Sequence, residues 1–282
     1  MKCDWQGYLR VVPQRIRMQV DVIGKDHLQE LRLRVGRHPE LVLKDSRIYL
    51  DAVVTEDDIT FCINSASQYS PWAANTVTSG YLTAQGGHRI GICGQMTLIN
   101  GKMISASSVT SLCIRVARDF PGLARSIPYQ SGSILIIGRP GCGKTTLLRD
   151  LIRMKSNFEA AAVGVVDERR ELFPVNGGVF CFSPGQHTDV ITGCNKTDGI
   201  TILVRSMNPR YIAVDEITAA EDCRAMLQAR GCGVEMIATA HAADIQDLMD
   251  RPVYKPILVA DMFQNLIVMQ SDNSWKLERM NV

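Results

Sequence analysis

Residues 138–145 read GRPGCGKT and fit the pattern G-x-x-x-x-G-K-[ST] at every fixed position. An apolar run at 133–137 precedes this loop, and residues 145–155 behind it have the character of a helix. A strand, a glycine-rich turn and a helix in this order direct backbone N–H groups at the β- and γ-phosphates of a nucleotide. A turn that only exposes a lysine does not need these flanking elements. The sequence therefore predicts a nucleoside triphosphate site, formed by Gly138, Arg139, Pro140, Gly141, Cys142, Gly143, Lys144, Thr145 and Thr146.

Two side chains of the loop suit the phosphates and their metal ion. Lys144 brings a positive charge to the phosphates, and the hydroxyl of Thr145 can ligate Mg²⁺. A second metal ligand is expected in residues 211–216, YIAVDE, an apolar strand that ends in two carboxylates. Ligands bind at the carboxyl ends of the strands in open α/β sheets. We therefore expect Asp215 to hold Mg²⁺ and Glu216 to orient or deprotonate the attacking water, with ATP and Mg²⁺ as the bound groups.

Two more apolar segments end in polar side chains. Residues 163–170, VGVVDERR, place Glu168 just after a strand, and residues 236–241, MIATAH, place His241 after another. A lone histidine is more often a structural residue than a catalytic one. Because this one follows a strand of the nucleotide-binding sheet, we predict a catalytic role for it, and we add Glu168 as a further acid of the site.

The pattern of the chain changes at residues 119–133, a linker rich in Pro, Gly and small polar residues. Upstream, a helix is expected at 56–70, followed by an antiparallel meander over 80–118 with turns at Gly86-Gly87 and Asn100-Gly101. The first part of the chain is therefore predicted to be a smaller α+β domain covering residues 1–122.

Downstream of the linker, short apolar strands alternate with helices, a pattern typical of a parallel sheet that is covered on both faces. The sequence thus predicts an α/β fold, with a P-loop domain built on a parallel-rich sheet over residues 123–282. The expected strands lie at 133–137, 161–166, 211–214, 236–240 and 266–269, and the expected helices at 145–155 and 219–230.

Composition excludes several classes of protein. The 31 basic and 29 acidic side chains give a net charge of +2, which provides no electrostatic reason to expect a nucleic acid as partner. No run approaches the roughly 18 apolar residues of a membrane span. The nine cysteines form no Cys-x-x-Cys pair, which argues against a zinc knuckle or a disulfide framework and favours reduced thiols in the cytoplasm.

This chain resembles the ATPases of the type II/type IV secretion superfamily, because it carries the same four elements in the same order. These are the phosphate loop, the acidic residues after 163–166, the acidic strand end and the histidine. Residues 203–212, LVRSMNPRYI, are similar to the stretch before that superfamily's acidic strand end. Residues 238–242, ATAHA, resemble its Thr-x-His-Ala box. The resemblance implies a RecA-like P-loop ATPase domain preceded by a smaller N-terminal domain.

A narrower resemblance covers nearly the whole chain and points to the stage III sporulation AA family of endospore-forming bacteria. It implies an ATPase that energises or assembles a secretion-type channel together with the membrane proteins of the stage III complex. It places the protein in the cytoplasm, peripheral to the inner membrane on the mother-cell side, as a homo-oligomeric ring of six subunits. The segments that carry it are 31–34, 80–83, 86–91, 140–150, 164–169, 203–207 and 212–217.

The secretion ATPases usually have Gly-Glu where this chain has Asp215-Glu216, so the division of labour between the two glutamates is open. We assign the base to Glu216 and a supporting role to Glu168. In that superfamily, arginines of the N-terminal domain approach the nucleotide. This favours Arg115, among the candidates Arg89, Arg115, Arg118 and Arg205, as the cation that stabilises the transferring phosphoryl group.

Two other functions stay open. A nucleotide-responsive scaffold would bind ATP to assemble and scarcely turn it over, but it has no need of both Asp215 and Glu216. A RecA-type nucleic-acid motor would be favoured by a basic groove or stacking aromatic residues, and the aromatic content of 6% gives it no support. An ABC-type ATPase is disfavoured because Ser183–Gln186 lacks the Leu-Ser-Gly-Gly-Gln signature.

Overall fold

The computed structural model describes residues 1–67, 80–99, 102–128, 131–176 and 178–280. The chain divides into two compact units. The first comprises Met1–Asp119 and Pro174–Cys181, and the second Phe120–Phe173 and Phe182–Val282. In the described part of the chain, no helix combines the length and the apolar character that crossing a membrane requires.

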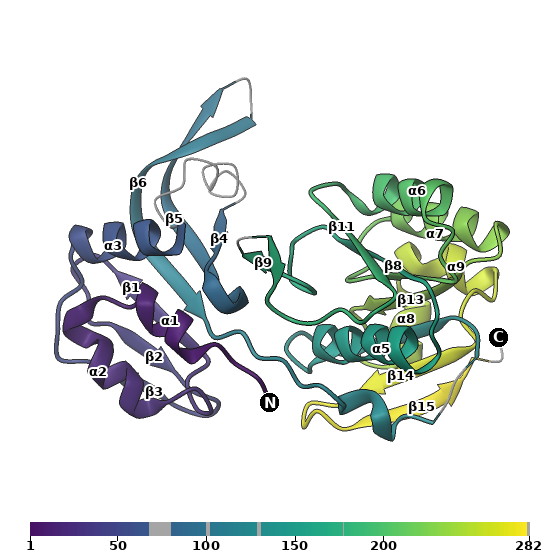
Figure 1. Cartoon of the computed structure of the whole chain (residues 1–282), viewed down its shortest axis with the longest axis horizontal. Coiled ribbons are helices and arrows are strands. Elements are labelled where there is room, and N and C mark those ends of the chain that lie inside the picture. Colours follow the sequence, from purple (N-terminus) through teal and green to yellow (C-terminus); the bar gives the residue numbers. More distant parts are fainter. Residues whose placement is uncertain (68–79, 100–101, 129–130, 177, 281–282) are drawn as a thin grey trace. The chain divides into compact units, whose positions relative to one another are not determined.

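The first unit contains a six-stranded antiparallel sheet in the order β3-β2-β1-β6-β5-β4 (Figure 1). Side chains along its strands alternate between the two faces of the sheet. On β1 (Glu30–Arg34), Leu31 and Leu33 are fully buried, while Arg32 and Arg34 lie on the opposite face. The strands are β1 (Glu30–Arg34), β2 (Glu40–Val42), β3 (Arg47–Tyr49), β4 (Tyr81–Thr83), β5 (Arg89–Ile99) and β6 (Lys102–Arg115).

The helices of the first unit join the core formed by the buried face of this sheet. They are α1 (Trp5–Val11), α2 (Gln14–Ile23) and α3 (Glu56–Ser67), and a 3₁₀ turn, η2 (Gln85–Gly87), joins β4 to β5. The predicted helix at 56–70 is thus confirmed over 56–67, its remainder lying outside the described residues, and the predicted turn at Gly86-Gly87 is confirmed. The predicted turn at Asn100-Gly101 also lies outside the described residues.

The second unit is built on a seven-stranded sheet in the order β11-β8-β12-β13-β7-β14-β15. The first six strands are parallel and the last is antiparallel to its neighbour. This confirms the predicted α/β fold with a parallel-rich sheet, including all five predicted strands. The strands are β7 (Ile134–Ile137), β8 (Val163–Asp167), β11 (Thr188–Thr192), β12 (Tyr211–Val214), β13 (Glu235–Ala240), β14 (Asn265–Met269) and β15 (Trp275–Arg279).

Helices cover this sheet, and every residue of β7, β8, β12 and β14 is buried. Alternate residues such as Leu135 and Ile137 share one core with the helices α6, α7 and α9. The long helix α5 contacts β7, β8 and β13 (Figure 1). The helices are α5 (Lys144–Phe158), α6 (Lys196–Ser206), α7 (Ala220–Gly231), α8 (Ile245–Asp250) and α9 (Lys255–Val259), with 3₁₀ turns η3 (Leu123–Ser126) and η4 (Pro252–Tyr254).

Two strands interrupt the predicted P-loop domain. Val175–Asn176 (β9) and Val179–Phe180 (β10) form a separate two-stranded antiparallel sheet. Although they lie between β8 and β11 in the chain, they belong to the first compact unit. The boundary at residue 122 remains a prediction.

The strand order fixes where the chemistry can gather. Strands β8, β12, β13 and β7 are consecutive neighbours and all run in the same direction. The residues that follow their carboxyl ends therefore meet at one edge of the sheet.

Candidate nucleotide site

The phosphate loop leads from β7 directly into α5. It begins at Gly138, where a Cβ atom would lie 2.5 Å from Sγ of Cys142 and 2.9 Å from Cβ of Met269. Only glycine fits that position without a shift of its neighbours. The thiol of Cys142 is itself buried, with 4% of the residue exposed. Cys142 can therefore serve a phosphate through its backbone N–H rather than through its side chain.

Lys144 is the first residue of α5, and only 6% of it is exposed. Its Nζ donates to the carbonyl oxygens of Gly138 at 2.8 Å and Arg139 at 3.0 Å, and lies 3.1 Å from Nδ1 of His241. Burial lowers the pKa of Lys144, and the carboxylates nearby oppose this shift. The ammonium group is thus held at the loop by three contacts that a phosphate could replace.

These contacts also assign the tautomer of His241. An ammonium group can only donate, so Nδ1 accepts from Lys144 and the ring proton of the neutral imidazole is on Nε2. Nε2 lies 3.1 Å from Oε1 of Glu216 and donates to it. The neutral ring therefore links the lysine of the phosphate loop to the predicted base.

Asp215 follows β12 and is held on both sides by hydroxyl groups. Thr145 donates to its Oδ2 at 2.9 Å, and Thr239 donates to its Oδ1 at 2.6 Å. The Thr239 hydroxyl also accepts from the backbone N–H of Glu216 at 2.7 Å. One fully buried threonine of β13 thereby fixes both carboxylate residues at the end of β12.

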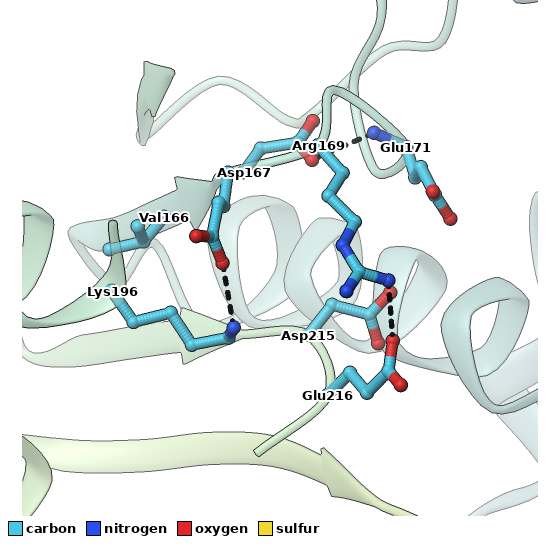
Figure 2. Close-up of a pocket in the computed structure, with 8 residues that line it drawn as sticks. Val166, Asp167, Arg169, Glu171, Lys196, Asp215 and Glu216 are labelled. Carbon is cyan, nitrogen blue, oxygen red and sulfur yellow. Dashed lines mark hydrogen bonds and ion pairs between the residues drawn. The ribbon is translucent and has the colours of Figure 1, made fainter. Parts of the chain in front are cut away.

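Glu216 adopts a left-handed backbone conformation, with φ of +58°. Non-glycine residues occupy this region at a cost, and such strain is concentrated at functional sites. Its carboxylate accepts from His241 on one oxygen. Nη1 of Arg169 lies 3.0 Å from the other oxygen (Figure 2). Both oxygens of the predicted base are therefore engaged by cationic or donor groups.

The loop that follows β8 is organised by a buried carboxylate. Asp167 accepts backbone N–H groups from Glu171 at 2.8 Å, Leu172 at 3.2 Å and Phe173 at 2.8 Å. Burial raises the pKa of Asp167, although these N–H groups favour the ionised form. Asp167 is therefore a support for the loop that carries Glu168 and Arg169.

Glu168 is directed at a buried lysine. Its Oε2 accepts from Nζ of Lys196 at 2.8 Å, and this Nζ also lies 3.9 Å from Oδ2 of Asp222. Asp222 in turn accepts from the backbone N–H groups of Thr218 and Ala219, at the start of α7. Glu168 thus lines the same pocket as Asp215 and Glu216, but its carboxylate is paired with Lys196.

The structure brings most of the predicted site residues together. Contacts connect Lys144, Thr145, Asp215, Glu216 and His241, whereas Arg115 belongs to the first unit. There its Nε lies 3.2 Å from Oε1 of Glu30. The other predicted nucleotide-binding residues are on the loop or in the first turn of α5: Arg139, Pro140, Gly141, Cys142, Gly143 and Thr146.

Three residues make contacts in the site that the sequence did not assign to them. Arg169 follows the acid at the end of β8, Lys196 begins α6, and Thr239 lies two residues before His241. Their sequence neighbours hinted at Arg169 and Thr239, which flank predicted site residues. Nothing in the sequence marks Lys196, because its partner Glu168 is 28 positions away.

The site suits a magnesium ion with few protein ligands. The hydroxyl of Thr145 and the carboxylate of Asp215 are hard oxygen donors within 2.9 Å of each other, the ligand type that Mg²⁺ prefers. Across the described ranges, no group of three or more His, Cys, Asp and Glu side chains could hold a metal. The donors therefore fit an ion that takes its other ligands from phosphate oxygens and water.

Comparison with known sequences gives matches over most of the chain. Residues 6–276 match the family described as "Sporulation stage III, protein AA". The chain is 36% identical to stage III sporulation protein AA of Bacillus subtilis (strain 168), over 87% of this chain and 84% of that protein. It is also 26% identical to the Arabidopsis thaliana protein SEEDLING PLASTID DEVELOPMENT 1, over 88% of this chain but 35% of that protein.

Solved structures resemble the chain over nearly its full length. The pilus retraction motor PilT with bound ADP has a TM-score of 0.66 at 14% identity, covering 95% of this chain and 83% of PilT. The ATPase DotB of Legionella pneumophila has a TM-score of 0.56 at 18% identity, covering 95% of this chain and 81% of DotB. At such identities the likeness establishes the fold alone, which is the RecA-like fold of secretion ATPases that the sequence predicts.

Proposed function

This chain belongs to the family of sporulation stage III AA proteins, and from that premise we propose that it hydrolyses ATP with Mg²⁺ to energise or assemble a membrane channel of the sporulating cell. The observation that carries the proposal is the connected set of contacts at the sheet edge. Thr145 of the loop bonds to Asp215, and Lys144 of the loop reaches Glu216 through His241. Phosphoryl transfer to water needs a lysine that binds the phosphates, a carboxylate that holds the metal ion and a base for the water, all close together.

Each residue has a distinct task in this proposal. The backbone of 138–143 and the ammonium group of Lys144 bind the phosphates of ATP. Thr145 and Asp215 hold Mg²⁺, which when bound neutralises charge on the β- and γ-phosphates. Glu216 accepts a proton from the water that attacks the terminal phosphorus, while His241 holds the carboxylate in place. Glu168 supports the site through Lys196.

The proposed assembly follows the family and the fold. We place the protein in a homo-oligomeric ring of six subunits on the cytoplasmic, mother-cell side of the inner membrane. Its partners in this proposal are the membrane proteins of the stage III complex, and no nucleic acid is involved. Arg115 is proposed as the cation that one subunit of the ring contributes to the nucleotide of another.

One observation favours a second candidate function. Both carboxylate oxygens of Glu216 are engaged, one by His241 and one by Arg169, and a base so engaged cannot accept a proton from water until a contact is released. A scaffold that binds ATP in order to assemble, with little turnover, needs no such release. Turnover separates the scaffold from the ATPase.

The test compares the wild type with Lys144→Ala and Glu216→Gln, measuring Mg·ATP affinity, phosphate release and particle mass on the same samples. We expect Lys144→Ala to lose binding, and Glu216→Gln to bind ATP but release phosphate at least about 100-fold more slowly. The matched control is Glu221→Gln, an exposed acid of α7 that pairs only within its own helix in the described contacts. ATP-dependent growth in mass without phosphate release would favour the scaffold, and normal hydrolysis by Glu216→Gln would refute the choice of base.

A further inference from the structure

Arg169 is a residue of the site to which the proposed function assigns no task. It extends from the loop after β8, and its Nη1 lies 3.0 Å from Oε2 of Glu216, 47 positions further along the chain (Figure 2). The two side chains are 54% and 31% exposed. An ion pair with this exposure contributes little to stability, because water screens it. The contact can therefore be exchanged at small cost.

The pocket around this contact is rich in carboxylates. Five of the side chains that line it are acids, and Arg169 and Lys196 are its cations. The acids are Asp167, Glu168, Glu171, Asp215 and Glu216. A triphosphate adds further negative charge beside Asp215 and Glu216, so positive charge beyond that of Lys144 and of the proposed Mg²⁺ stabilises its terminal phosphate.

The two cations of the pocket differ in their freedom to supply that charge. Lys196 has 5% of its surface exposed and is held between Glu168 and Asp222. Removing it from them would leave the buried carboxylate of Asp222 without its cation, which is costly. Arg169 is half-exposed on a loop, and its guanidinium group matches the geometry of phosphate oxygens. Of these two cations, Arg169 is the one that can move to a phosphate.

We propose that Arg169 is a latch on Glu216 that passes to the terminal phosphate when ATP binds. This inference rests on the proposed function, and it assigns a cation from the same subunit to the phosphate, in addition to Arg115. In the nucleotide-free state Arg169 holds the carboxylate of Glu216. In the ATP state the guanidinium group binds a terminal phosphate oxygen, and the released oxygen of Glu216 can accept from the attacking water.

A second contact in the site, that of Lys144 with His241, can also be exchanged for a phosphate. Lys144 donates to His241, and His241 donates to Glu216. When phosphates take the ammonium group of Lys144, Nδ1 of His241 loses its donor. Glu216 thus has one contact that depends on Lys144 and another that depends on Arg169. Both cations leave this network for the same ligand, so triphosphate binding and release of the base become one event.

The experiment compares Arg169→Gln and Arg169→Lys with the matched control Arg170→Gln. Arg170 is the next residue of the same loop, and its side chain makes no ion pair or hydrogen bond with the described residues. Affinities for Mg·ATP, a non-hydrolysable ATP analogue and Mg·ADP are measured by calorimetric titration. We expect Arg169→Gln to weaken triphosphate binding roughly 10- to 100-fold, the loss expected for a hydrogen bond to a charged group, with less than about a threefold change for ADP.

The second arm tests the latch itself. Glu216→Gln removes the carboxylate that pairs with Arg169 in the nucleotide-free state, so it should tighten triphosphate binding by about two- to fivefold, the contribution of an exposed ion pair. This gain should vanish in the double variant Arg169→Gln/Glu216→Gln. Arg169→Lys should recover part of the lost affinity because it keeps the charge.

Each outcome has a single consequence. An unchanged ratio of ATP to ADP affinity in Arg169→Gln would overturn the latch and leave the proposed function intact. If that unchanged ratio comes from equal losses of affinity for both nucleotides, it indicates that Arg169 only shapes the loop. Failure of the wild type to bind ATP would overturn the proposed function, and the latch with it.

Discussion

Replacing Thr239 with valine tests whether one buried hydroxyl group holds the site together. Thr239 is fully buried in β13, donates to Asp215 at 2.6 Å and accepts from the N–H of Glu216 at 2.7 Å. Valine has nearly the same shape but can neither donate nor accept. The substitution therefore removes two hydrogen bonds and leaves the packing of the strand almost unchanged.

The magnitude follows from these two bonds. A hydrogen bond to a charged acceptor contributes about 1.5–3 kcal/mol, and one between neutral groups about 0.5–1.5 kcal/mol. Burying a methyl group in place of the hydroxyl returns about 0.8 kcal/mol. Thr239→Val should therefore lower the local free energy of unfolding by about 1–4 kcal/mol. Thr239→Ser keeps the hydroxyl group and should lose less.

The assay is hydrogen exchange in increasing urea, read by mass spectrometry on peptides from residues 211–217 and 235–241. These peptides report on β12 and β13 alone, which matters because the two compact units need not unfold together. Thr201→Val is the matched control, since its hydroxyl donates to the carbonyl of Thr197 within α6, away from the site. If Thr239→Val destabilises the strands no more than this control, the hydroxyl does not hold the carboxylates and the reasoning fails.

Two other predictions concern the phosphate loop. Burial lowers the pKa of Lys144 below its ordinary 10.5, and phosphates favour its charged form. The affinity for Mg·ATP should therefore fall as the pH rises through this lowered pKa. Titrations from about pH 7 to about pH 10 should show the fall in the wild type but not in Lys144→Arg. Gly138→Ala should destabilise the protein by about 1–3 kcal/mol through overpacking and abolish ATP binding. At Gly141 no atom lies within 4 Å of the Cβ position, but φ is +81°. Gly141→Ala should therefore cost only about 1–2 kcal/mol of backbone strain. Thermal unfolding and nucleotide titration check this pair, and equal effects would contradict it.

The part of the site that the sequence predicts consists of residues whose chemistry coincides with a local pattern. Lys144 and Thr145 belong to a continuous motif, and Asp215, Glu216 and His241 each follow an apolar strand. Parallel strands then bring these ends together without further information. What the sequence could not predict are the partners, because pairing of Arg169 with Glu216 depends on side chains 47 positions apart.

The missed elements of the fold have a similar explanation. The helix α6 contains Gly199, Ile200 and Val204, which are poor helix formers, and the sequence pattern assigns it no element. Packing decides instead: a Cβ at Gly199 would lie 2.6 Å from Val166, so only glycine lets the helix approach β8 this closely. The strands β9 and β10 have two residues each and carry no periodicity that could reveal them.

The contacts of Glu216 explain why its backbone strain is tolerated. The φ of +58° brings its N–H to the hydroxyl of Thr239, while its carboxylate meets His241 and Arg169. The three groups that hold this residue belong to or follow two other strands, β13 for Thr239 and His241 and β8 for Arg169, so no single local change relieves the strain. A conformation that costs about 1–2 kcal/mol is thus sustained by three contacts, of which the one with Arg169 is exchanged for a phosphate in the proposed ATP state. Strain held in this way makes the position of Glu216 responsive to the occupant of the loop, which a relaxed glutamate at the end of β12 could not be.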